Sequence, residues 1–512
     1  MLTCLPDRQV LFYKKYPLMM SSRELILSTD VIISESPNFA KGKPMKNILL
    51  ISLFGFSSLV FPQKIYDNLD SLLSNASRLD IFSGVVLIAD KDSVNYLKAY
   101  GDLDWDRNIP NRTDTKFNIG SIGKLFTQIL ITQLIQEGKL SLSDNLEKLY
   151  PIYHNENDKK ITVKLLLTFS AGPGDYFQIK EFQQHPDSYR DVKDLAELIS
   201  KEPLLYEPGT SNKYSNSSYV ILGGIIEKIT GKTYLQNLME RILVPLGMNN
   251  SGFIYKDSKT VNTAKGFIVT PDGRKESTYE RTPSVPTPAG GMYSTAEDLL
   301  KLDRSLMNDN KLLADDLKAL LLNRFDEKRK ETWAEMKAKP DFGIGVAGGS
   351  PGWNAVYDQN VNGKYTVIVL SNFDMGAESI MSRIHAVLKD EKYPPLQVNM
   401  GRFIYKKIRE NGTEDFVINY KEYLSSFRIN NDMILNRTGY QLLNAGYTDE
   451  AIAVFLVNTK YFPDVANTYD SLGEAYMVKG DKENAITNYK KSLELDPDNK
   501  NAEKTIQMLE GK

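Results

Sequence analysis

An internal repeat of 34 residues is the feature that most constrains how the C-terminal part of this chain folds. The stretch "LNAGYTDEAIAVFLVNTKYFPD" aligns with "MVKGDKENAITNYKKSLELDPD", and four kinds of residue recur 34 positions apart: Gly446 and Gly480, Ala451 and Ala485, Phe455 and Tyr489, and Pro463 and Pro497. Small residues where helices cross, an aromatic in the second helix and a closing proline predict pairs of antiparallel helices. A single pair cannot bury its apolar face, so we expect about three pairs to stack on one another or on the preceding domain.

This pattern resembles the tetratricopeptide repeat. A further step of 34 residues towards the N-terminus reaches Gly412, within a more degenerate stretch that we interpret as a third repeat. Pro394-Pro395 marks a boundary before the repeats. We therefore expect an all-α repeat domain over 400–512. The resemblance implies that this domain binds a protein partner or mediates self-association.

The region before this boundary shows strands at both ends and helices between them. Alternating apolar residues predict a β-hairpin over 83–101, and "FGIGVAGGSPGWNAVYDQNVNGKYTVIVLSN" predicts three strands within 342–371, the last two joined by a turn at Asn362-Gly363. Helical periodicity covers 121–138, 190–201, 217–230, 295–308 and 376–390. This order favours an α+β domain over 64–393, with one antiparallel sheet flanked by helices and an inserted helical region.

The N-terminal segment 1–63 has the pattern of a targeting sequence. One lysine followed by the apolar run 48–61 after Met45 is typical of a secretory signal peptide, so 45–63 is the expected signal and 1–44 an upstream extension. This predicts a periplasmic or secreted protein; the alternative is a buried helix of a cytosolic protein. The only cysteine is Cys4, which leaves the mature protein without a disulfide or a thiol nucleophile.

Charge excludes one class of partner. Lysine and arginine number 63 against 65 aspartate and glutamate, for a net charge of −2, so no large basic surface for nucleic acid is expected. We expect small-molecule or protein partners instead.

Ser121 and Lys124 are the first candidates for chemistry. Their i, i+3 spacing in "GSIGKLFT" places a hydroxyl and an ammonium on one face of a first helical turn. Ser121 could be only a helix cap, but a cap is usually followed by Glu or Gln at its third position, and a lysine there opposes the helix dipole. A buried lysine with a lowered pKa can instead accept the serine proton and generate a nucleophile.

Tyr214 and Asn216 supply two further candidates just before the helix at 217–230. A phenol near a lysine ammonium is expected to have a lowered pKa, which suits a general base. The amide NH₂ of Asn216 is expected to bind a substrate carbonyl. The alternatives are a core tyrosine and a helix-capping asparagine.

Taken together, these stretches resemble the serine β-lactamase and penicillin-binding-protein superfamily, in its β-lactamase-related branch of class C enzymes, esterases and D-amino-acid peptidases. The resemblance covers about 70–390 and includes "FNIGSIGKLFT", "LLLTFSAGPGDY", "YEPGTSNKYSNSSYVILGGIIEKITGK", "TPAGGMYSTAEDLLKLDRSL" and "FGIGVAGGSPGW". It implies that Ser121 is the acylated nucleophile, Lys124 its proton partner, Tyr214 the general base and leaving-group acid, and Asn216 a substrate-positioning group. It implies no cofactor.

The third motif of the family departs from its usual form here. Its cation, small residue and glycine correspond to Val346, Ala347 and Gly348, so a carboxylate-binding cation is missing and neutral esters or amides become more plausible substrates. Ala347, Gly348 and Gly349 remain candidate substrate-binding residues, with the N–H groups of Ser121 and Gly349 as an oxyanion hole. Phe169 replaces a common histidine, which we expect to alter packing rather than chemistry.

A rival nucleophile is Ser350 in "GGSPG", which matches the G-x-S-x-G elbow of α/β-hydrolases. That elbow needs a helix after the serine, whereas a strand pattern follows here, so we favour Ser121. The three histidines, His154, His185 and His385, lack the spacing of metal ligands, and we expect no metal site.

Two functional hypotheses remain. The first is a serine hydrolase that acts on an ester, amide or peptide-like substrate through an acyl-enzyme on Ser121. The second is a non-catalytic β-lactamase-like protein that binds a ligand or partner while its repeats scaffold other proteins. Val346 favours the second hypothesis, and the intact set of Ser121, Lys124, Tyr214 and Asn216 favours the first.

Overall fold

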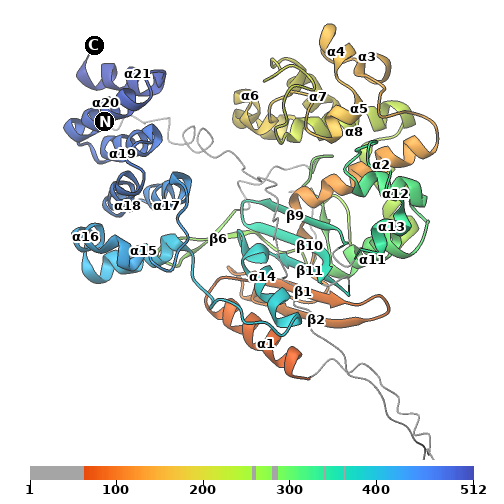
Figure 1. The fold of residues 1–512 in the computed structure, drawn as a ribbon, viewed down its shortest axis with the longest axis horizontal. Helices are drawn as coiled ribbons and strands as arrows, with labels where there is room; N and C mark the ends of the chain where they lie inside the picture. Colours follow the sequence, from red (N-terminus) through yellow and green to blue (C-terminus); the bar gives the residue numbers. More distant parts are fainter. Residues whose placement is uncertain (1–62, 256–260, 279–285, 340–341, 362–363, 512) are drawn as a thin grey trace, which may run out of the picture.

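A five-stranded antiparallel sheet forms the centre of the N-terminal domain (Figure 1). The computed structural model describes residues 63–255, 261–278, 286–339, 342–361 and 364–511. The strand order is β2-β1-β11-β10-β9, which brings the two ends of the domain sequence into neighbouring strands. The strands are β1 (Gly84–Ala89), β2 (Val94–Tyr100), β9 (Gly345–Ser350), β10 (Trp353–Val361) and β11 (Tyr365–Ser371). The predicted hairpin and three strands are confirmed, while the expected turn at Asn362-Gly363 lies outside the described residues.

The two faces of the sheet bury different cores. In the register Val85 lies opposite Leu370 and Val86 opposite Val369, so neighbouring residues alternate between faces. Val86 and Val369 pack with α1 (Gln63–Arg78) and α14 (Gly376–Leu388). Val85 and Leu370 belong to the larger core, which also includes buried residues of α2 (Gly123–Gln136), α8 (Asn216–Thr230) and α11 (Ala296–Asn308). This larger core is the one that reaches the candidate nucleophile, Ser121.

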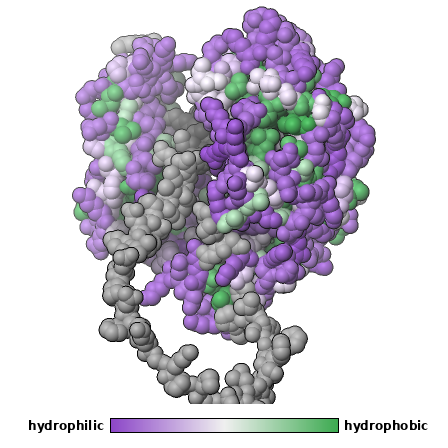
Figure 2. All heavy atoms as spheres, turned by 45° about the vertical axis from the view of Figure 1, so that its right-hand side comes forward, coloured by the Kyte–Doolittle hydropathy of each residue, from purple (hydrophilic) through white to green (hydrophobic). Residues whose placement is uncertain are grey.

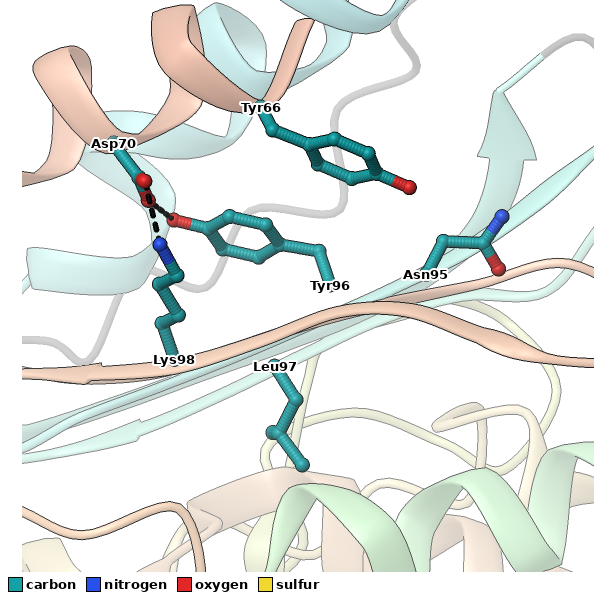
Figure 3. Close-up of a pocket in the computed structure, with 6 residues that line it drawn as sticks. All are labelled: Tyr66, Asp70, Asn95, Tyr96, Leu97 and Lys98. Carbon is teal, nitrogen blue, oxygen red and sulfur yellow. Dashed lines mark hydrogen bonds and ion pairs between the residues drawn. The ribbon is translucent and has the colours of Figure 1, made fainter. Parts of the chain in front are cut away.

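Helix α1 is attached to β2 by a polar cluster around Asp70 (Figure 3). Asp70 accepts hydrogen bonds from Tyr96 Oη at 2.7 Å and Lys98 Nζ at 2.5 Å. A surface hollow of about 300 Å³ lies there, whereas Leu97 points to the opposite face of the strand. Because its charged groups bind one another, we interpret this cluster as a structural attachment.

The helices that lie between β2 and β9 in the sequence cover one end of the sheet, at the upper right and right of Figure 1. The predicted helices are confirmed as α7 (Val192–Ser200), α8 and α11, and each begins after a residue that caps it: Asp191, Ser215 and Thr295. The remaining helices are α3 (Leu146–Leu149), α4 (Glu156–Lys160), α5 (Val163–Leu167), α6 (Lys180–Gln184), α9 (Tyr234–Leu238), α10 (Val244–Leu246), α12 (Asp315–Leu322) and α13 (Trp333–Lys337). The minor elements are β3 (Asp102–Asp104), β4 (Ile109–Pro110), β5 (Phe117–Asn118), β6 (Phe267–Val269), β7 (Lys275–Ser277), β8 (Tyr293–Ser294), the 3₁₀ turns η1 (Gly120–Ile122), η2 (Tyr176–Gln178) and η3 (Pro186–Ser188), and the π-helical turn η4 (Met239–Leu243).

The C-terminal part is entirely helical within the described residues and forms a column beside the sheet domain (Figure 1). Its helices are α15 (Met400–Asn411), α16 (Thr413–Tyr423), α17 (Asp432–Asn444), α18 (Thr448–Tyr461), α19 (Ala466–Lys479), α20 (Lys482–Leu495) and α21 (Lys500–Glu510). The repeat residues lie where expected: Phe455 of α18 packs on Gly439 of α17, where a Cβ would come within 2.5 Å of its ring. Gly412 joins α15 to α16, so the degenerate stretch also forms a helix pair.

Several side chains connect the repeats to the sheet domain. Tyr447 Oη donates to Asp272 Oδ2 at 2.6 Å, and Arg402 Nη1 donates to the carbonyl of Leu79 at 2.8 Å. Arg383 of α14 donates to the carbonyls of Pro394 and Pro395 at 3.0 and 2.8 Å. Hydrophilic side chains cover most of the visible face of both bodies in Figure 2. Among the described residues, no helix is long and apolar enough to cross a membrane.

Candidate active site

Ser121 lies in the 3₁₀ turn η1, immediately before α2 begins at Gly123. Neither the start of η1 nor the start of α2 has a side-chain capping hydrogen bond. The alternative of Ser121 as a helix cap is therefore wrong. Its hydroxyl instead contacts Lys124 and Tyr214.

Lys124 is buried, and its Nζ donates to three oxygen atoms. These are Asn216 Oδ1 at 2.7 Å, the carbonyl of Ala289 at 2.6 Å and Ser121 Oγ at 3.1 Å. Burial lowers the pKa of Lys124 to about 7, because the apolar surroundings disfavour the ammonium, while the charge of Asp175 acts in the opposite direction. The expected lowering by desolvation is confirmed. A substantial fraction of neutral amine at neutral pH is what a base for a serine proton requires.

Tyr214 Oη lies 2.7 Å from Ser121 Oγ, so the structure brings the third predicted residue into contact with the nucleophile. The predicted pKa shift is wrong, however. Burial raises the pKa of Tyr214, and the hydrogen bond with Ser121 offsets this only in part. The Lys124 Nζ atom lies 4.8 Å from the centre of the Tyr214 ring, so it faces the π-system rather than the phenolic oxygen. Tyr214 is thus a phenol near neutral pH, which makes it a proton donor.

Asn216 is the first residue of α8, and its side chain is buried against Lys124. Its Oδ1 accepts from Lys124, while its Nδ2 donates to Asp175 Oδ2 at 2.7 Å. The amide NH₂ that we expected to bind a substrate carbonyl is therefore turned towards Asp175. Sequence reasoning did not single out Asp175, although it lies within the motif "LLLTFSAGPGDY"; a carboxylate just before an aromatic turn was the available signal.

Phe169 packs against the site, as expected for a change in packing. Its ring centre lies 4.8 Å from that of Tyr214 and 5.3 Å from that of Tyr219. Its carbonyl accepts from Tyr206 Oη at 2.7 Å and from the backbone N–H of Lys213 at 3.1 Å. These contacts hold the segment that carries Tyr214.

Strand β9 approaches the turn of Ser121 very closely. A Cβ on Gly348 would lie 2.1 Å from the Ile119 carbonyl oxygen and 2.7 Å from Ser121 N, and a Cβ on Gly120 would lie 2.5 Å from Gly349 N. Glycine at 120 and 348 thus allows the Gly349 amide to lie beside η1. Ala347 packs with the core under α1 and α14, so its side chain faces away from Ser121, and only its backbone remains a candidate for binding substrate.

Val346 lies near the start of β9, and Ser350 is its last residue. Val346 packs on the larger core and lies opposite Tyr357. Ser350 is followed by the turn to β10, a strand, so the helix that a nucleophile elbow needs is absent at this point of the described chain. The elbow was disfavoured from the sequence, and the structure agrees.

Each of the three histidines lies on a different segment. His154 and His185 are exposed, and His385 of α14 has its Nε2 3.5 Å from Asp358 Oδ2. In the ranges that the structure describes, no group of three or more His, Cys, Asp or Glu side chains could hold a metal ion.

Comparison with known proteins agrees with this arrangement. The profile of the family described as Beta-lactamase matches residues 69–389. The chain belongs to the beta-lactamase family. The profile described as Tetratricopeptide repeat matches residues 466–499, so the resemblance of the C-terminal part is confirmed as well.

Relatives of this beta-lactamase-family chain are similar over most of its N-terminal domain. A teichoic acid D-alanine hydrolase of Staphylococcus aureus (strain MRSA252) is 27% identical over 64% of this chain and 79% of its own length. The crystal structure of a penicillin-binding protein from Bacillus halodurans has a TM-score of 0.54 at 26% identity, over 63% of this chain and 98% of that one. FmtA from Staphylococcus aureus shares the fold with a TM-score of 0.52 at 24% identity, over 65% and 92% of the two chains. The predicted α+β fold is confirmed, and at the level of the family so is the prediction of a serine hydrolase.

Proposed function

We propose that this protein hydrolyses an ester or amide through an acyl-enzyme on Ser121, with Lys124 as the base and Tyr214 as the proton donor. One observation carries the proposal: the Ser121 hydroxyl contacts one group that tends to lose its proton and another that tends to keep it. Ser121 Oγ lies 3.1 Å from Lys124 Nζ, whose pKa is lowered, and 2.7 Å from Tyr214 Oη, whose pKa is raised. Such a separation of pKa values assigns one group to accept a proton and the other to donate one.

In the proposed acylation, the neutral amine of Lys124 takes the Ser121 proton while Oγ forms a bond to the substrate carbonyl carbon. The carbonyl oxygen becomes an oxyanion, which the N–H groups of Ser121 and Gly349 are suited to stabilise because β9 lies against η1. The bond to the leaving group then breaks, and Tyr214 donates its proton to the departing oxygen or nitrogen. The ammonium of Lys124 restores the phenol. In deacylation the same steps run in reverse, with water in the place of the leaving group. Water gives up a proton and attacks the acyl carbon, the bond to Oγ breaks, and Oγ regains its proton, which releases the acid and frees Ser121.

The substrate we favour has no carboxylate on its acyl part. Val346 occupies the position at which the family usually carries a cation, and it is partly buried against the apolar core. A related protein is named a teichoic acid D-alanine hydrolase. An ester or amide of D-alanine fits both observations, since its acyl group carries an ammonium and no free carboxylate. We therefore propose D-alanyl esters as the first substrates to test.

The domain limits and the role of the repeats are also part of the proposal. We propose 64–393 as the hydrolase domain and 400–512 as the repeat domain, with the repeats binding a protein partner or a second copy. The signal peptide at 45–63 and the periplasmic or secreted location stay predictions, because that segment lies outside the described residues.

Intact-protein mass spectrometry tests the proposed function directly. The purified full chain is incubated separately with a fluorophosphonate, a penicillin and an activated D-alanyl ester, alongside Ser121→Ala and Ser350→Ala. We expect a covalent adduct with the fluorophosphonate and turnover of the ester in the wild type and in Ser350→Ala, and neither in Ser121→Ala. A folded wild-type protein that gives no adduct and no turnover would contradict the proposal and favour the non-catalytic binding protein.

A further inference from the structure

Asp175 is a buried acid with no assigned part in the reaction. It precedes η2, where its Oδ1 accepts from the backbone N–H of Phe177 at 3.1 Å. Its Oδ2 faces Asn216 and accepts from Nδ2 at 2.7 Å and from the backbone N–H at 3.5 Å. Burial raises the pKa of Asp175, while these hydrogen bonds and the charge of Lys124 lower it. Because both oxygens accept hydrogen bonds, we treat Asp175 as an ionised carboxylate.

We infer that Asp175 is a positioning residue that aims the lone pair of Lys124 at Ser121 by holding the Asn216 amide in one orientation. The inference rests on the proposed function, since it explains how the proposed base is made effective. Asp175 touches neither Ser121 nor the reacting atoms: it directs the lone pair through Asn216, and its charge acts on Lys124 directly.

Asp175 fixes the orientation of the Asn216 amide. An asparagine side chain can turn over and exchange its oxygen and nitrogen at little steric cost. An ionised carboxylate only accepts hydrogen bonds, so the Asn216 atom that faces Asp175 must be Nδ2. The atom that faces Lys124 must then be Oδ1, which only accepts.

Neutral Lys124 has too few hydrogens to donate to all three of its neighbours. A neutral amine has two N–H groups and one lone pair, and Nζ has three neighbours within hydrogen-bond distance. Two of them, Asn216 Oδ1 and the Ala289 carbonyl, cannot donate, so each takes one N–H. The lone pair is left for the third neighbour, the Ser121 hydroxyl, which can donate its proton. Turning the Asn216 amide over would place an NH₂ against the lysine and compete for that lone pair.

The charge of Asp175 also affects the pKa of Lys124. The groups that face Lys124 are Ser121 from η1, Asn216 and Tyr219 from α8, Tyr214 from the segment before α8, the carbonyl of Ala289, and Asp175 beyond Asn216. The two tyrosines are phenols, because burial raises the pKa of each. The charge of Asp175 favours the ammonium form and raises the pKa of Lys124 against the effect of burial. Removing that charge would leave more neutral amine at low pH.

The experiment measures how fast a fluorophosphonate labels Ser121 as a function of pH, in the full chain. Wild type is compared with Asp175→Asn, with Asn216→Ala and with the double variant. Asp158→Asn is the matched control, because Asp158 is another buried carboxylate of the helical region and accepts from three backbone N–H groups at Ile152, Tyr153 and His154. Thermal unfolding of every variant reports folding separately.

In Asp175→Asn we expect the pH of half-maximal labelling to fall by on the order of one unit, because the charge that favours the ammonium form of Lys124 is removed. We also expect the maximal rate to fall about tenfold or more, since a misdirected lone pair loses most of a general-base effect. In the Asn216→Ala background the same substitution should still shift the midpoint but should no longer lower the maximum. Asp158→Asn should change neither.

The inference is overturned if Asp175→Asn keeps the wild-type midpoint in a folded protein, or if it lowers the maximum equally with and without Asn216. NMR titration of ¹³Cε-lysine, with the Lys124 signal assigned by Lys124→Met, separates this inference from the proposed function. If wild type is not labelled at all, the proposed function fails, yet an unshifted Lys124 titration in Asp175→Asn would still refute the part assigned to Asp175.

Discussion

Tyr214 Oη lies 2.7 Å from Ser121 Oγ, and burial keeps this phenol protonated. A donor in this place is needed only when the leaving group cannot depart as an anion. In the proposed mechanism we therefore expect Tyr214 to matter most for substrates with a basic leaving group.

Tyr214→Phe should lower kcat/KM for an alkyl ester by about 10²–10³-fold, as expected for the loss of a general acid. The same variant should lose less than about tenfold on the matching 4-nitrophenyl ester, because 4-nitrophenolate needs no proton to leave. Tyr219→Phe is the control, since it removes another buried phenol, bonded to Gln128 rather than to Ser121. Equal losses on both esters would show that Tyr214 acts on the nucleophile instead.

The pH dependence of the reaction should follow Lys124. Only the neutral amine can accept the Ser121 proton, so kcat/KM should rise with pH and reach half its maximum near the pKa of Lys124, about 7. Stopped assays with a 4-nitrophenyl ester across the pH range measure this midpoint. Lys124→Arg should be inactive at every pH, because a guanidinium stays charged. A midpoint several units higher in wild type would identify the Tyr214 phenolate as the base.

Gly348→Ala should damage both the site and the fold. The added methyl group would lie 2.1 Å from the Ile119 carbonyl oxygen, so β9 must move away from η1 and take the Gly349 N–H with it. We expect a loss of about 1–3 kcal/mol in the free energy of unfolding from overpacking, and about 10²–10³-fold in kcat from a displaced oxyanion donor. Denaturant unfolding and ester hydrolysis measure the two effects.

Gly345→Ala is the matched control for this substitution. It lies on the same strand, and the nearest atom to its added Cβ would be Asp358 Oδ1 at 3.9 Å. It should leave kcat within about twofold of wild type, since nothing at the site has to move. Normal hydrolysis by Gly348→Ala would contradict the assignment of Gly349 N–H as an oxyanion donor.

Val346→Lys should restore reactivity towards a substrate with a carboxylate. A hydrogen bond between a new ammonium and that carboxylate is worth about 1.5–3 kcal/mol, which corresponds to about a 10- to 100-fold faster acylation by benzylpenicillin. The rate is measured as the appearance of the penicilloyl adduct on the intact protein. Val346→Met has a similar length without the charge and should give no gain. If both variants react alike, the valine is not what limits penicillin recognition.

Much of the site could be predicted because its residues lie close together in the sequence. Ser121 and Lys124 share one turn, so their i, i+3 spacing alone indicates a common face, and Tyr214 and Asn216 lie two positions apart at the start of α8. The strands and helices of the sheet domain were likewise readable from their periodicity. The direction in which the Tyr214 pKa shifts could not be predicted, since it depends on burial by segments such as the one carrying Phe169.

By itself, the sequence determined the kinds of reactive group and the two folding units, because hydrophobic periodicity, capping residues and the 34-residue repeat act over short distances along the chain. Only the tertiary structure decided which group holds the proton, which way the Asn216 amide turns, and which residues of β9 face Ser121. These properties depend on desolvation and on contacts between segments far apart in the chain: Asp175 meets Asn216, and Gly348 meets the turn of Ser121, only after the sheet and its helical region have packed together.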